Sequence, residues 1–81
     1  MRMKFMYRNH AGKIEDREIE FIKLFYDFLT HEEFGYVQPG WTITGRDFSK
    51  GRDGSQVRSF RLHNILTGSS TAFKAITIVE D

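Results

Sequence analysis

Apolar and polar residues alternate with a period of two along most of this 81-residue chain, and turn residues interrupt the alternation at short intervals. This is the period of a β-strand with one buried face. It favours strands, with turns between them, over residues 3–8, 13–21, 41–47, 57–62 and 71–79. Five short strands predict a mostly β domain, a strongly bent sheet that closes into a small SH3-like or Sm-like barrel.

Two segments are also compatible with helix. Residues 13–21 contain Glu and Lys, and their apolar residues roughly match a 3.6-residue spacing, but the glycine turn before them favours a strand. Residues 24–34 carry leucines and phenylalanines at helical spacing, and Gly35 follows as a stop. We expect one short helix or helical loop in residues 24–34, with its aromatic side chains forming a lid over one end of the core.

The length and composition indicate one domain over residues 1–81. The chain has no Cys, which excludes disulfides, thiolate metal sites and a cysteine nucleophile. It also lacks the apolar runs of a membrane span or a secretion signal. We therefore expect a cytoplasmic protein that uses no metal, cofactor or membrane. The net charge is +1, but residues 1–13 and 46–61 are basic and residues 14–33 acidic. Charges of both signs either solvate a small surface or steer an anionic ligand to one end of the molecule.

Catalytic patterns are weak. The three histidines, His10, His31 and His63, lack the spacing of a zinc site, and no phosphate-binding glycine loop is present. The acids of residues 14–33 alternate as the solvated face of a strand does. Ser69 and Ser70 follow His63 without a defined base and orienting group, so a small hydrolase is the least favoured interpretation. The sequence predicts a protein that is not an enzyme.

Two arginines share the parity of the apolar face. Arg17 matches Ile19 on the second strand, and Arg58 matches Phe60 on the fourth. A buried guanidinium requires an anionic partner or a path to the rim. One interpretation is purely structural, with partners among Asp16, Asp47 and Asp53. The other is functional: the two arginines, with Tyr7 and Trp41 near the same end, form a pocket for a phosphate or a nucleotide.

The order of several short motifs resembles the WYL domain family. The motifs are Phe5-Met6-Tyr7-Arg8-Asn9 with Gly12, Arg17-Glu18-Ile19-Glu20, Gly40-Trp41-Thr42-Ile43-Thr44-Gly45-Arg46-Asp47 and Arg58-Ser59-Phe60-Arg61-Leu62-His63-Asn64-Ile65. They span about residues 3–65. The resemblance implies an Sm-like or SH3-like barrel of bacterial and phage regulators of transcription, which senses a ligand, often nucleic acid or a nucleotide. Positions that match the family pattern are Tyr7, Arg17, Trp41, Asp47, Arg58 and Arg61.

The chain also departs from this family. Thr42 stands where the family has Tyr, Ile43 stands where it has Leu, and residues 22–36 form a longer and more aromatic connection. No helix-turn-helix precedes residue 1, so we expect a stand-alone domain.

The first functional hypothesis is a non-enzymatic ligand-binding or regulatory module that binds single-stranded nucleic acid or a nucleotide. Its predicted binding residues are Tyr7, Arg17, Trp41, Arg46, Asp47, Arg58 and Arg61. The alternative is a protein-interaction adaptor of phage or mobile-element type. It would act on a host transcription or defence factor through its sheet edge or the aromatic segment 24–36. Both hypotheses are compatible with a monomer or a homodimer.

Overall fold

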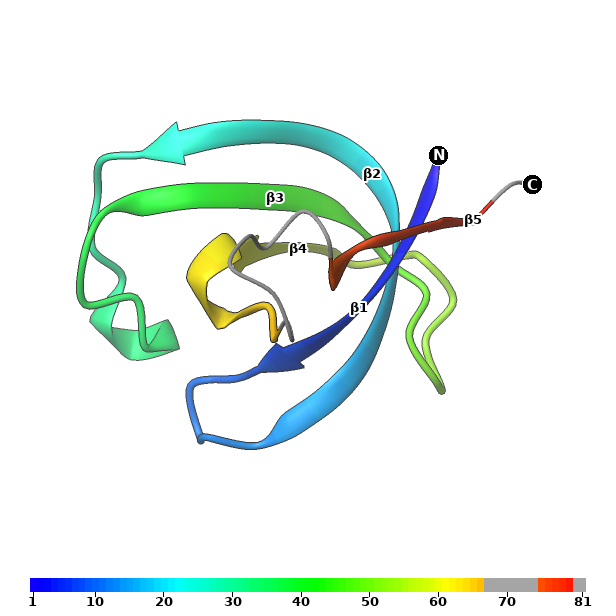
Figure 1. Ribbon diagram of the computed structural model, residues 1–81, viewed down its shortest axis with the longest axis horizontal. Coiled ribbons are helices and arrows are strands. Elements are labelled where there is room, and N and C mark those ends of the chain that lie inside the picture. Colours follow the sequence, from blue (N-terminus) through cyan, green and yellow to red (C-terminus); the bar gives the residue numbers. More distant parts are fainter. Residues whose placement is uncertain (67–74, 80–81) are drawn as a thin grey trace.

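The sheet of this protein consists of five antiparallel strands in the order β4-β3-β2-β1-β5. The computed structural model describes residues 1–66 and 75–79. Within them lie the 3-10 turns η1 (Glu32–Phe34) and η2 (Leu62–Asn64) and the strands β1 (Arg2–Arg8), β2 (Ile14–Asp27), β3 (Gly40–Asp47), β4 (Val57–Arg61) and β5 (Thr77–Val79). The predicted mostly β class with five strands is confirmed (Figure 1).

The long strand β2 gives the sheet its curvature. Its first half pairs with β1 and its second half with β3, so the helical alternative for residues 13–21 is wrong. The register with β3 shifts between Phe21 and Lys23, and such a bulge bends a strand. Gly45 lies across this bend, where a Cβ would come within 2.6 Å of the Glu20 carbonyl oxygen. Figure 1 shows β2 curving around so that the sheet wraps on itself.

The helical segment expected within residues 24–34 is much shorter than its apolar spacing suggests. Residues 24–27 continue β2 and pair with β3, because the β3 backbone satisfies their hydrogen-bonding groups. The helix is the single turn η1, which ends at Gly35 with φ 80°. The expected aromatic lid is also wrong, since Phe28 and Phe34 are exposed.

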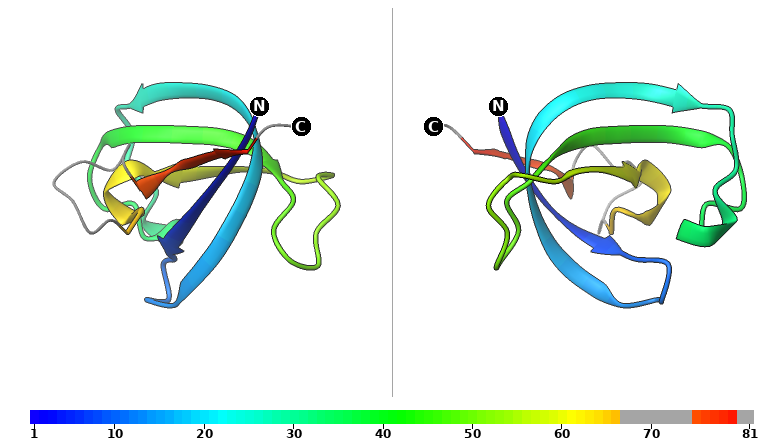
Figure 2. Two further views of the ribbon diagram at one scale, coloured as in Figure 1. Left: turned by 45° about the vertical axis from the view of Figure 1, so that its right-hand side comes forward. Right: turned by 180° about the vertical axis from the view of Figure 1, so that it is seen from behind.

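The curled sheet remains an incomplete barrel, because β4 and β5 do not pair with each other in the described part of the chain. After η2 the chain returns to β1, where Ile65 bridges Tyr7 and the Leu66 N–H donates to the Met6 carbonyl at 3.0 Å. Figure 2 shows this return from two further directions. The last strand was expected over residues 71–79. β5 forms its end, and residues 71–74 lie outside the described residues.

The inner face of the curled sheet holds the core. Phe60 is its centre, with edge-to-face contacts to Tyr7 at 5.0 Å and to Phe5 at 5.3 Å between ring centroids. Burying such a ring contributes about 1.5–3 kcal/mol. The buried apolar residues are Met3, Phe5, Tyr7, Ile19, Ile43, Phe60, Leu62 and Ile65. The core therefore draws on β1, β2, β3 and β4 and on the segment that follows β4.

Candidate functional site

One buried carboxylate organises the polar end of the curled sheet. Asp47, at the end of β3, is 0% exposed. Its Oδ2 atom lies 3.2 Å from Nη1 of Arg17, 3.3 Å from Nε of Arg52 and 3.2 Å from Nε of Arg58. Three guanidinium groups from three separate segments therefore converge on a single oxygen atom. The sequence placed Arg17 and Arg58 on this inner face, and the structure brings both to Asp47.

The loop between β3 and β4 is folded so that Arg52 joins this cluster. The Asp47 N–H donates to the Gln56 carbonyl and the Gly54 N–H donates to the Asp47 carbonyl, each at 2.9 Å. Gly54 has φ 83°, and a Cβ there would lie 2.1 Å from Cζ of the Phe48 ring. Only glycine fits this position, because both the backbone conformation and the ring exclude a side chain.

Gln56 holds Arg52 and Arg58 side by side. Its Oε1 atom accepts hydrogen bonds from Nη1 of Arg52 at 3.0 Å and from Nη2 of Arg58 at 2.7 Å. Nη2 of Arg52 and Nη1 of Arg58 have no protein partner among residues 1–66 and 75–79. Arg17 differs, since its Nη2 atom pairs with Glu15 at 2.8 Å. The cluster thus offers free donors at Arg52 and Arg58.

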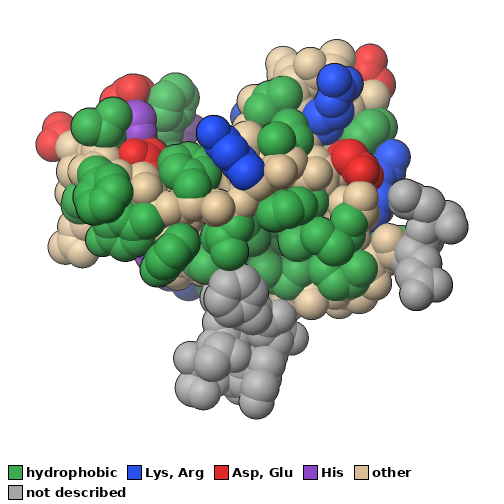
Figure 3. Space-filling view, turned by 90° about the horizontal axis from the view of Figure 1, so that it is seen from above, with side chains coloured by type: hydrophobic (Ala, Val, Ile, Leu, Met, Phe, Trp, Pro, Cys, Tyr) green, Lys and Arg blue, Asp and Glu red, His purple; other side chains and the backbone are tan. Residues whose placement is uncertain are grey.

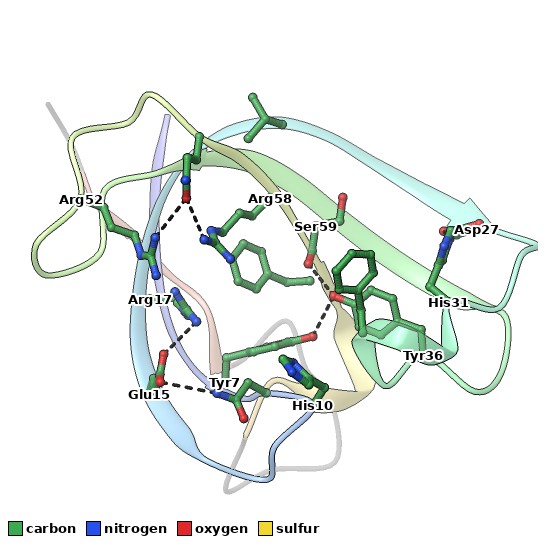
Figure 4. A pocket seen from close by; sticks show the side chains of 15 residues that line it. Tyr7, His10, Glu15, Arg17, Asp27, His31, Tyr36, Arg52, Arg58 and Ser59 are labelled. Carbon is green, nitrogen blue, oxygen red and sulfur yellow. Dashed lines mark hydrogen bonds and ion pairs between the residues drawn. The ribbon is translucent and has the colours of Figure 1, made fainter.

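These arginines line an open pocket of about 820 Å³. Tyr7 and Phe60 form its apolar floor, and both are buried. In Figure 4 the arginines gather on one side of the pocket, Tyr36 and His31 lie on the other, and Tyr7 and His10 lie between. Cavities of this size accommodate small ligands, and this one combines cations with aromatic rings.

The aromatic wall belongs to the segment between β2 and β3. Tyr36 donates its hydroxyl proton to the Ser59 carbonyl at 2.5 Å, and its hydroxyl lies 3.2 Å from that of Tyr7. Burial raises the pKa of Tyr36 well above its ordinary value. Gly35 packs against His10, where a Cβ would lie 2.7 Å from the His10 Cβ. This contact joins the β1–β2 turn to the aromatic wall.

The predicted binding residue Arg61 does not line the pocket, and its guanidinium lies behind the aromatic wall, 4.7 Å from the centre of the Tyr36 ring. It is 0% exposed, and its side chain donates to the Leu29 carbonyl at 2.8 Å, the Gly40 carbonyl at 3.1 Å and the Thr42 hydroxyl. It also lies 3.4 Å from Asp27. Arg61 has the opposite parity to Arg58 and Phe60, so it reaches the segment between β2 and β3. It acts as a structural anchor for that segment.

Asp27 is the carboxylate at the far wall of the pocket. The Leu29 N–H donates to it at 2.9 Å, and Nε2 of His31 lies 3.0 Å from it. The Leu29 hydrogen bond, followed by His31 and Arg61, lowers the pKa of Asp27. Asp27 is therefore an ionised carboxylate at this wall, and it is paired with the buried guanidinium of Arg61.

Trp41 and Arg46 also lie apart from the pocket. Trp41 is 53% exposed, and its ring packs edge-on against Tyr26 at 5.4 Å. Arg46 is exposed, and its parity is opposite to that of Asp47. The structure thus unites Tyr7, Arg17 and Arg58 at the pocket with Asp47 behind them, and it separates Trp41, Arg46 and Arg61 from that group.

The sequence interpretation missed Arg52, Gln56 and Tyr36. Arg52 had a weak signal, because two glycines flank it and a glycine-rich loop can fold back on its own strand end. Nothing in the sequence pointed to Gln56, since it contributes to the site only by accepting hydrogen bonds from two arginines at once. Tyr36 reaches the pocket only because residues 28–39 pass the free edge of β4. These three contacts are tertiary.

Among the residues that the structure describes, no group of three or more His, Cys, Asp and Glu side chains is placed to hold a metal ion. His10 and His31 line the pocket. Neither 3-10 turn in the described ranges has the length and apolar character that crossing a membrane requires.

Comparison with protein-family models, with curated proteins and with solved structures finds no match for this chain. The resemblance to the WYL domain therefore stays a prediction.

Proposed function

We propose that this protein is a non-enzymatic binding module whose pocket holds single-stranded nucleic acid or a nucleotide. The observation that carries the proposal is the pair Arg52 and Arg58, held by Asp47 and Gln56 with one terminal nitrogen of each guanidinium unpartnered among the described residues. Such nitrogens donate to phosphate oxygens in a geometry that a lysine cannot reproduce. Because Asp47 fixes both groups beforehand, little conformational entropy is lost when a ligand binds.

The aromatic wall supports the same class of ligand. A nucleobase stacks on tyrosine, phenylalanine or histidine rings, and each such contact contributes about 1–3 kcal/mol. Phe34 is exposed and lines the pocket together with Tyr36 and His10. The distribution of cations on one side and rings on the other matches a ligand with a phosphate at one end and a base at the other (Figure 4).

Fluorescence anisotropy with labelled single-stranded DNA and RNA tests the proposal. We expect binding that weakens steeply as salt is added. Arg58→Ala should weaken it at least about tenfold, because a charge-assisted hydrogen bond is lost. Arg46→Ala removes the same charge from an exposed site outside the pocket and is the matched control. Equal losses in both variants, or no binding by the wild type at low salt, would contradict the proposal.

A second function is favoured by a different surface. Tyr26, Phe28 and Trp41 form an exposed aromatic cluster, with ring centroids 4.8 and 5.4 Å apart, and Phe28 is 79% exposed. Figure 3 shows hydrophobic side chains gathered over the face of β2 and β3. Exposed apolar patches of this kind mark contacts with other proteins. This surface supports the alternative proposal of a protein-interaction adaptor.

Sedimentation equilibrium, together with the emission of Trp41, tests whether this surface is used between copies of the chain. Trp41 is the only tryptophan, so its emission reports directly on the cluster. Association that shifts this emission and is abolished by Phe28→Ser would favour the adaptor. If the protein is a monomer at all concentrations, a homodimer is excluded, and an adaptor would have to bind a different protein through this surface.

A further inference from the structure

A closed ring of contacts surrounds the pocket. On one side of the ring, Arg17 of β2 and Arg52 of the β3–β4 loop both reach Asp47, at 3.2 and 3.3 Å. On the other side, the Tyr36 hydroxyl donates to the Ser59 carbonyl of β4 at 2.5 Å. Figure 4 shows the labelled side chains arranged around the space that they line. The segments that form the pocket are therefore tied to one another at both of its ends.

The ring closes between the β1–β2 turn and the segment before β3. Gly35 packs against this turn, where a Cβ would lie 2.7 Å from the His10 Cβ, and the Tyr7 hydroxyl lies 3.2 Å from the Tyr36 hydroxyl. Beneath the ring lie the buried side chains of Tyr7 and Phe60, whose ring centroids are 5.0 Å apart. In the part of the chain that the structure describes, the pocket therefore has a floor, and a strand that enters it leaves by the same mouth.

Two adjacent guanidinium groups supply the free donors of this pocket. Arg52 and Arg58 both contact Oδ2 of Asp47 and both donate to Oε1 of Gln56, so the two groups lie side by side. Their side chains are 38% and 40% exposed, which makes them accessible from the mouth. A single phosphate that presents several oxygen atoms can therefore accept hydrogen bonds from both.

The carboxylates that line the pocket already have cationic partners. Glu15 lies 2.8 Å from Nη2 of Arg17 and 3.9 Å from Nζ of Lys13. Asp27 lies 3.4 Å from the buried guanidinium of Arg61. An entering phosphate therefore meets a site whose unpartnered groups are positive, and such a site attracts a dianion more strongly than a monoanion.

Resting on the proposed function, we infer that the pocket binds a nucleotide with a phosphomonoester, as carried by the end of a single strand, in preference to an internal linkage. A terminal phosphate is joined to the strand through one ester bond only. It therefore enters a pocket with a single mouth while the rest of the strand stays outside. It also has three acceptor oxygens and a charge of about −1.5 to −2, whereas an internal phosphodiester has two such oxygens and one negative charge. The phosphate binds Arg52 and Arg58, and the base stacks toward Tyr36.

Isothermal titration calorimetry in buffer free of divalent cations tests this selection. The ligands share one DNA sequence: a linear strand with a 5′-phosphate, one with a 3′-phosphate, one with hydroxyl groups at both ends, and the covalently closed circle, which has no end. We expect one of the phosphorylated strands to bind about tenfold tighter than the circle and than the strand with two hydroxyl ends. This is the contribution of about one additional charge-assisted hydrogen bond.

A nucleoside monophosphate carries the same phosphomonoester and distinguishes the source of the ligand. Affinity equal to that of the preferred strand supports the phosphomonoester site and assigns it to free nucleotides. Weaker binding than that strand, but binding that the unphosphorylated nucleoside does not show, supports the site and assigns it to strand ends.

Two variants identify the group responsible. Arg52→Ala removes one of the two guanidinium groups and should reduce the preference for the phosphorylated strand over the circle at least threefold. Lys50→Ala makes the same change in charge at an exposed position of the same loop, outside the pocket, and should leave the preference unchanged. Thermal unfolding checks that both are folded. Arg52→Lys keeps the charge beside Asp47 without the planar fork, and it should reduce the preference even if Arg52→Ala does not fold.

The outcomes separate the two proposals. If the wild type binds the circle as tightly as both phosphorylated strands, the selection of ends is overturned and the proposed function stays in place. An unchanged preference in folded Arg52→Ala or in Arg52→Lys also overturns the selection. No binding of any strand, circle or nucleotide overturns both.

Discussion

The hydroxyl of Tyr7 lies 3.2 Å from the hydroxyl of Tyr36, and the pair joins β1 to the free edge of β4. Tyr36 gives its only proton to the Ser59 carbonyl, so the proton between the two hydroxyls comes from Tyr7. The Tyr7 oxygen in turn accepts the Arg61 N–H at 3.3 Å. Two tyrosine side chains thus provide, between β1 and the free edge of β4, hydrogen bonds that a neighbouring strand would otherwise provide.

Tyr36→Phe should lower the free energy of unfolding by about 1–2 kcal/mol, because the Ser59 carbonyl and the Tyr7 hydroxyl each lose a partner. Urea denaturation measures the change. Tyr26→Phe is the control, since Tyr26 is exposed and its hydroxyl has no protein partner in the described ranges. Equal stability of Tyr36→Phe and the wild type would show that the tyrosine pair does not stabilise the fold.

Asp47→Asn should lower the free energy of unfolding by about 3 kcal/mol, because three guanidinium groups would lose their shared counterion. Arg52 and Arg58 are partly exposed, which keeps the expected loss at the lower end of the range for buried ion pairs. The same denaturation experiment on Asp16→Asn, an exposed site, should show a change within about 0.5 kcal/mol. If Asp47→Asn lowered the free energy of unfolding by no more than this, solvent would already be compensating the charges of the arginines.

Gly54→Ala should destabilise the protein more than Gly51→Ala. Both glycines have φ 83°, so both variants lose about 1–2 kcal/mol to backbone strain. Only at Gly54 does the new Cβ collide with the Phe48 ring, because a Cβ at Gly51 has nothing within 4 Å. The difference between the urea unfolding midpoints of the two variants therefore measures the cost of the steric clash with Phe48. Equal midpoints would mean that Phe48 moves aside freely.

The free energy of unfolding should depend on Asp27 in acid. Its pKa in the folded protein is lowered from the ordinary 3.8, so ionised Asp27 stabilises the fold above that value. This contribution is lost as the pH falls below 3.8 and through the lowered pKa. Urea unfolding of wild type and Asp27→Asn across this range measures it. The difference between them should shrink toward acid, and a constant difference would contradict the assignment.

Alternation in the sequence was sufficient to predict the strands and the inward direction of Arg17 and Arg58, because strand parity is a local property. It was insufficient for residues 24–27, because their apolar residues fit both the helical period of 3.6 and the strand period of two. Only the pairing with β3 makes them a strand. Arg61 was assigned to the pocket by resemblance, although its parity is opposite to that of Arg58. Tyr36 could not be predicted and Arg52 had only a weak signal, since each reaches the pocket through a loop whose path depends on contacts with distant residues.

The convergence of three guanidinium groups on Asp47 makes this end of the sheet locally frustrated, since three like charges are held together by the carboxylates of Asp47 and Glu15. Unfolding relieves that repulsion, and so does an anion that enters the pocket. Binding and folding are therefore thermodynamically linked: a fitting ligand at one hundred times its Kd raises the free energy of unfolding by about 2.7 kcal/mol.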